Sequence, residues 1–169
     1  MAGPGTGMGI SLTTITTDLQ APLGFIHTEP ASVDGHGERT FIYIRYVATA
    51  VPVDLVDGQV MGLVAGEVGY NNVVLSTLPD PGTVVGVSQQ VWTWTDHYPS
   101  GPGAADALFG FVQRTGLGDV LQAGGVVQDI GIISGGAGDA TTSGATSSSF
   151  GTAHTSGAGT LPCTLACKG

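Results

Sequence analysis

Four histidines and a few loop carboxylates are the side chains of this chain that could bind a metal ion or move a proton. The histidines are dispersed: His27, His36, His97 and His154. No two of them form an H-x-H or H-x-x-x-H pair, so a zinc or iron site would need the fold to gather them. Turn aspartates could hold calcium, but the EF-hand spacing is absent and we expect solvated carboxylates. These aspartates are Asp54, Asp57, Asp80 and Asp139. The sequence therefore predicts no metal site.

The closest approach to a hydrolase triad is Asp96, His97 and Ser100. Adjacent residues of a strand point to opposite faces, so the Asp96 carboxylate would not orient the His97 ring. The Gly-x-Ser-x-Gly nucleophile elbow is also missing. A G-x-G-x-G run near the N-terminus is similar to a dinucleotide-binding loop, but no strand precedes it and no amphipathic helix follows it. We therefore expect no catalytic residues, no cofactor and no enzyme activity.

Cys163 and Cys167 are the only cysteines, in a C-x3-C spacing. In a strand, these positions share one face and lie about 13 Å apart. That separation is too large for a disulfide unless a turn lies between them, and no further zinc ligands are near in sequence. Buried free thiols are expected.

Trp92 and Trp94 offer a different chemistry, aromatic stacking. In a predicted strand from Gln90 to Thr95 the two side chains lie on one face, where indole rings could stack on a sugar. Tryptophans on one face of a strand more often belong to a core or to a subunit interface. We take the tryptophan pair, together with His97 and Tyr98, as a candidate interface, with the sugar site as its alternative.

The charge balance narrows the possible partners. Against 13 carboxylates the chain has four cations, Arg39, Arg45, Arg114 and Lys168, for a net charge of −9 over 169 residues. Nucleic-acid binding needs a basic surface, and anionic membrane surfaces are disfavoured by the same sign. No apolar run reaches the roughly 18 residues of a membrane span, and a secretory signal is not expected at the N-terminus. Only 10 % of the residues of the chain are charged, so its surface is poor in ion-pairing groups, and we expect a partner to cover part of it.

The elements that must position these residues are strands, and the clearest of them lies in the segment from Ala107 to Leu121. Alternate residues of a strand point to opposite faces. Phe109 and Phe111 thus share one face, and Leu108 and Val112 share the other. Because both faces are apolar, this strand should lie centrally, between layers or inside a barrel.

Three glycines punctuate the same segment. Gly110, between the two phenylalanines, indicates that something packs close to the backbone there. Gly116 and Gly118 predict a turn, with Asp119 to Leu121 as the returning strand.

The rest of the chain has the pattern of short strands joined by Gly/Pro turns. Further strands are expected at 23–27, 40–49, 53–56, 59–64, 73–78, 83–88, 126–133, 150–154 and 160–167. We expect an all-β protein, a single β-barrel or β-sandwich domain over residues 21–169, preceded by an extended N-terminal arm over residues 1–20. The glycine-rich arm should not fold on itself and should order against a neighbour.

The order of these features resembles that of the decoration, or cement, proteins of tailed-bacteriophage heads. The segments that carry the resemblance are Pro22–Phe25, Arg39–Ile44, Gly86–Ser88, Phe109–Gln113, Gly124–Gly125 and Thr160–Leu165. Two features depart from the family pattern. Phe111 stands where tryptophan is commoner, and a Pro/Gly-rich insertion over 96–106 separates two motif strands and suggests an added contact surface.

The resemblance implies a virion structural protein made in the host cytoplasm and located on the outer surface of the capsid. Such a protein binds the major capsid protein and stabilises the shell by bridging its subunits, and the resemblance also implies a homotrimer. The alternative is a host- or carbohydrate-binding β-domain on the virion surface.

Overall fold

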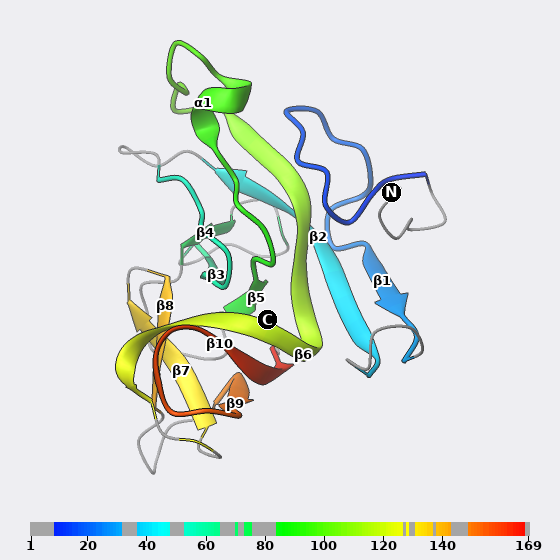
Figure 1. Ribbon diagram of the computed structural model, residues 1–169. Coiled ribbons are helices and arrows are strands. Elements are labelled where there is room, and N and C mark those ends of the chain that lie inside the picture. The colour runs from blue at the N-terminus through cyan, green and yellow to red at the C-terminus, as the bar shows by residue number, and fades with distance from the viewer. Residues whose placement is uncertain are drawn as a thin grey trace.

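The computed structural model describes ten strands and one short helix (Figure 1). It covers residues 9–31, 37–47, 53–64, 70, 73–75, 84–126, 128, 131–136, 138–142 and 149–167. The elements are β1 (Ile26–Glu29), β2 (Arg39–Val47), β3 (Val60–Leu63), β4 (Val73–Leu75), β5 (Val84–Val87), α1 (Trp94–His97), β6 (Ala107–Val126), β7 (Gly131–Gly136), β8 (Asp139–Thr142), β9 (Gly151–Ala153) and β10 (Gly157–Ala166). The expectation of an all-β fold is confirmed. His36, Asp80, Lys168 and residues 1–8 lie outside the described residues.

Five of the strands close into a barrel. β2 pairs with β4, β4 with β3, β3 with β5, β5 with β6, and β6 with β2. Buried apolar side chains of these strands form one core cluster, which includes Ile42, Ile44, Met61, Val73, Val85, Leu108 and Val112. The edge strand β1 lies outside this ring and pairs antiparallel with β2.

The remaining strands form a second ring on the far half of β6. β6 pairs with β10, β10 with β9, β9 with β7, and β7 with β8, which returns to β6 through the pair Gln122–Ala140. Figure 1 shows these strands gathered around the lower part of β6. Their core also takes in Val60 and Val87 of the first barrel, so the two rings pack against each other.

β6 is one strand of 20 residues that bends, where we had expected a turn and a returning strand. Residues up to Thr115 pair with β2, and residues from Thr115 onward pair with β10. At the bend, Gly116 has a φ of 90°, in the left-handed region that glycine adopts without steric cost. The expected turn at Gly116 and Gly118 was therefore wrong, because the glycine redirects the strand without reversing it.

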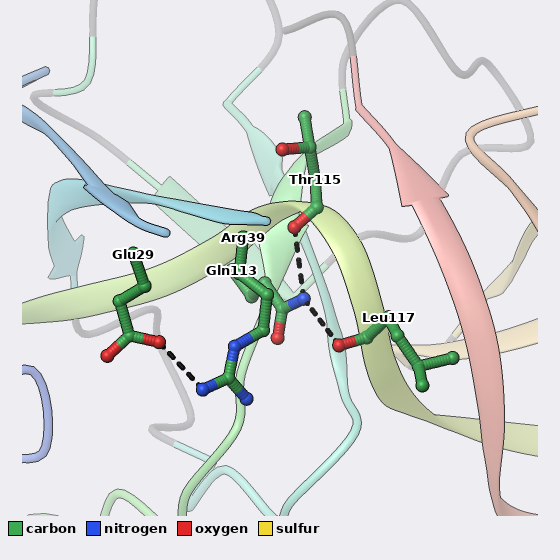
Figure 2. Close-up of polar contacts among 5 residues, drawn as sticks. All are labelled: Glu29, Arg39, Gln113, Thr115 and Leu117. Carbon is green, nitrogen blue, oxygen red and sulfur yellow. Dashed lines mark hydrogen bonds and ion pairs between the residues drawn. The ribbon is translucent and has the colours of Figure 1, made fainter. Parts of the chain in front are cut away.

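The buried side chain of Gln113 forms hydrogen bonds to the backbone on both sides of the bend. Its Nε2 donates hydrogen bonds to the carbonyl oxygens of Thr115 and Leu117, each at 3.0 Å (Figure 2). Gln113 is fully buried, and hydrogen bonds gain strength where water is excluded. The amide thus satisfies two backbone carbonyls on either side of Gly116.

The central position expected for the first half of β6 is confirmed. Phe111 is buried on the outer face, where its ring lies 5.0 Å from that of Tyr43. Leu108 and Val112 are buried on the other face, inside the barrel. A Cβ added to Gly110 would lie 2.9 Å from the Trp92 ring, so the expected close packing at this glycine is also present.

Residues 9–20 are not a free arm. Thr16 and Phe109 exchange two backbone hydrogen bonds, of 3.0 and 2.8 Å. Leu12 is buried against the outer face of β2 and β6, and Figure 1 shows the segment running beside these strands. The expectation that this segment orders only against a neighbour was wrong for the described residues, because its apolar side chains cover an aromatic face of the domain itself.

Gly101 and Gly116 both have a left-handed backbone conformation, but we expect alanine to destabilise the protein more at Gly116, because the bend depends on it. Gly101→Ala should cost about 1 kcal/mol for its backbone conformation alone, because nothing lies within 4 Å of an added Cβ. Gly116→Ala should cost more than about 2 kcal/mol, since the added Cβ would also meet the Glu38 carbonyl oxygen and the Arg39 side chain. Urea unfolding followed by tryptophan fluorescence measures both. Equal losses would contradict a bend that depends on Gly116.

Candidate functional site

The structure places both candidate tryptophans inside the protein. The expected strand over 90–95 is not formed: Trp92 makes a single antiparallel bridge with Leu55, and Trp94 begins α1. The two side chains are 0 % and 2 % exposed, and both pack on the Tyr46 ring. They are core residues, which corrects their assignment as interface anchors and removes the sugar-stacking alternative.

His97 is the last residue of α1, and Tyr98 follows it as the C-cap and packs against the core cluster of these tryptophans. Both are half-buried. The Tyr98 hydroxyl donates to the Ala107 carbonyl oxygen at 3.0 Å, and its ring lies 5.9 Å from that of Trp94. The loop that follows is largely exposed and is tied internally by the Gly103 N–H, which donates to the Asp106 carboxylate at 2.7 Å. Of the four candidate interface residues, these two therefore lie nearest the surface, and Tyr98 has a structural role.

Exposed apolar side chains lie on the ribbon that covers Trp92. Residues 53–56 run antiparallel to residues 91–93, with Leu55 and Trp92 exchanging two backbone hydrogen bonds of 3.0 Å. We call this pair of segments the valine ribbon, because Val53, Val56 and Val91 are 43 %, 45 % and 57 % exposed. The sequence indicated apolar strands here but could not say which residues face outward, because that depends on the bridge between Leu55 and Trp92.

A hollow of about 190 Å³ lies on the outer face near the bend of β6. Its lining residues are Leu12, Thr13, Glu29, Arg39, Phe41, Gln89, Gln90 and Phe111. Arg39 is the one Lys or Arg among them, and its Nη2 already pairs with the Glu29 carboxylate at 2.7 Å (Figure 2). Because that pair neutralises the cation, the hollow has no free positive charge with which to select an anion.

The two cysteines are buried free thiols, as expected. The Gln122 amide donates to the Cys163 sulfur at 3.2 Å. Burial raises the pKa of Cys163 to about 11 and that of Cys167 to about 12. Thiolates are the reactive form of cysteine, so neither thiol is set up for nucleophilic or redox chemistry at neutral pH.

Two absences among the described residues bear on the type of site. No group of three or more His, Cys, Asp or Glu within that part of the chain is placed to hold a metal ion. No helix among the described residues is long and apolar enough to cross a membrane.

Comparison with known proteins gives no relative. No family model, no curated protein and no solved structure matches the chain.

The buried thiols predict a loss of stability at alkaline pH. A thiol whose pKa is raised on folding stabilises the folded state fully below its unfolded pKa, near 9.0, and this contribution is lost as pH rises through the folded values. The free energy of unfolding should therefore fall between about pH 9 and pH 12. A Cys163→Ala/Cys167→Ala variant should be less stable at neutral pH because of the cavities, yet decline less steeply. Urea unfolding at a series of pH values would contradict this account if the two curves ran parallel.

Proposed function

We propose that this protein is a decoration protein of a tailed-bacteriophage head. In this role it binds the outer surface of the assembled capsid and bridges neighbouring subunits of the major capsid protein. We include in the proposal the homotrimer that the resemblance implies. The protein would act without catalysis, as a structural component of the virion.

The observation that carries the proposal is the convergence of three segments on which the resemblance rests. Gly24 and Phe25 exchange backbone hydrogen bonds of 2.8 and 2.9 Å with Tyr43. Tyr43 is in turn the register partner of Phe111 in β6, and the ring of Phe111 lies 6.3 Å from that of Phe25. Segments that are far apart in sequence thus build one aromatic cluster. This supports the idea that the shared pattern reflects a shared fold.

The mechanism follows from thermodynamic linkage. A protein that binds the assembled shell more tightly than its separated subunits stabilises the assembled state by mass action. Such binding needs a rigid surface and few groups that must be ordered on contact. A small all-β domain whose β6 is covered on both faces meets that need. The rival proposal, a host- or carbohydrate-binding domain, used the tryptophan pair and the loop over 96–106 as its binding face, and both tryptophans of that face are buried.

The test uses heads of the phage that encodes this chain, stripped of the protein and then titrated with purified protein. We expect saturable co-sedimentation and a higher melting temperature for decorated heads than for bare heads. Binding should hold steady or rise between about 0.05 and 0.5 M salt, because screening removes repulsion between copies that each carry a net charge of −9. Absence of binding to heads would overturn the proposal. A steep loss of binding with salt would show an electrostatic attachment instead.

A further inference from the structure

We propose that two adjoining hollows at the bend of β6 form a binding site for a neutral saccharide. The first is the hollow described above, and the second has the same volume of about 190 Å³. The second hollow is lined by Arg39, Gln89, Leu117, Gly118, Asp119 and Pro162. Because Arg39 and Gln89 line both hollows, we treat the two as one site and call it the bend groove. Neither tryptophan lines it, and the inference does not depend on the proposed function.

The size and the walls of the bend groove fit two linked sugar rings. Each hollow of about 190 Å³ corresponds to roughly six water molecules at about 30 Å³ each, which is close to the volume that one pyranose displaces. Phe41 and Phe111 contribute to the wall of the first hollow, and Leu117 and Pro162 to that of the second. Small-molecule sites combine such apolar walls with a few placed polar groups, and the C–H groups of a sugar ring pack on the apolar part.

The polar groups of the bend groove are held in place before any ligand binds. The Gln89 carboxamide donates to the Asp119 carbonyl oxygen at 2.9 Å and accepts from the Asp119 backbone N–H at 3.1 Å. Arg39 Nη2 donates to the Glu29 carboxylate at 2.7 Å. A guanidinium has five N–H donors, and this ion pair uses one of them. A site whose polar groups are already fixed loses little entropy when a ligand binds.

A buried acceptor without a donor lies beside the second hollow. Gln113 Oε1 is buried and has no hydrogen-bond partner among the described residues, although Nε2 of the same carboxamide donates twice (Figure 2). A Cβ added to Gly118 would lie 2.7 Å from this oxygen, and Gly118 lines the second hollow. Buried polar atoms of native proteins nearly always have a partner. A ligand hydroxyl in this hollow supplies the donor that the oxygen lacks.

The charges of the bend groove select a neutral ligand. Arg39 is paired with Glu29, and the chain carries a net charge of −9, so an anion gains little attraction there. A cationic ligand is disfavoured by Arg39, which lines both hollows. The groove offers donors on Arg39 and acceptors on Glu29 and Gln113, and a hydroxyl both donates and accepts. An uncharged ligand with many hydroxyls meets all of these groups, and a saccharide is that class of ligand.

The test is an amide NMR titration of the wild-type protein with D-glucose, D-galactose, D-mannose and N-acetylglucosamine, and with a disaccharide of each. At least one sugar should shift the signals of Gln89, Gly118 and the Gln113 side-chain amide in a saturable way, with a Kd of about 1 mM. The matching disaccharide should bind more tightly than its monosaccharide, because it occupies both hollows.

Two variants and one matched control assign the binding to the bend groove. Arg39→Met should weaken it about tenfold, since the hydrogen bonds of the guanidinium are lost. Arg45→Met is the control: Arg45 lies on the same face of β2 but roughly 20 Å further along the strand, so affinity should not change. Thr13→Trp, at an exposed position on the first hollow, should block that hollow and leave the ion pair intact. Melting temperatures of all three variants should stay close to wild type.

Three outcomes would overturn the inference. The first is that no sugar of the panel causes a saturable shift up to about 50 mM. The second is sugar binding that both Arg39→Met and Thr13→Trp leave unchanged, which would place it elsewhere on the protein. The third is a blocked trialanine peptide that shifts the same amides at lower concentration than every sugar, which would make the ligand a peptide. Binding to heads is measured separately, so failure of either proposal leaves the other standing.

Discussion

The bend in β6 is the constraint on which the rest of the structure depends. A strand can serve two rings only if it changes direction while both of its edges stay hydrogen-bonded. Gly116 supplies the left-handed backbone conformation, and the buried Gln113 amide satisfies the Thr115 and Leu117 carbonyls on either side of it. The first barrel, the second ring and the aromatic outer face are all assembled against this one strand.

Local alternation made the two faces of β6 and the close packing at Gly110 predictable from sequence. The bend was not predictable in the same way, because a glycine with positive φ serves equally well in a hairpin turn. What distinguishes the two cases is the partner strand. Residues after Gly116 pair with β10, some 40 positions away in sequence, and no local pattern reports that pairing.

The burial of the candidate interface tryptophans could not be predicted from local sequence either, but for a different reason. Trp92 and Trp94 were correctly recognised as large aromatic residues that need a core or a partner, but alternation could not decide between the two. The tertiary structure shows that they belong to the core, because both rings pack against Tyr46 in the core cluster of the barrel. Smaller apolar side chains, those of Val53, Val56 and Val91, are the ones exposed on the ribbon that covers Trp92.

The central claim is that β6 makes the two rings one cooperative unit. Native-state hydrogen exchange of the amides in β2 and β10 tests it most directly, because these strands lie in different rings and both pair with β6. The slowest amides of the two strands should open with the same free energy, equal to that of global unfolding. If β10 exchanged through a partial unfolding of distinctly lower free energy while β2 stayed protected, the rings would be independent and this account would be contradicted.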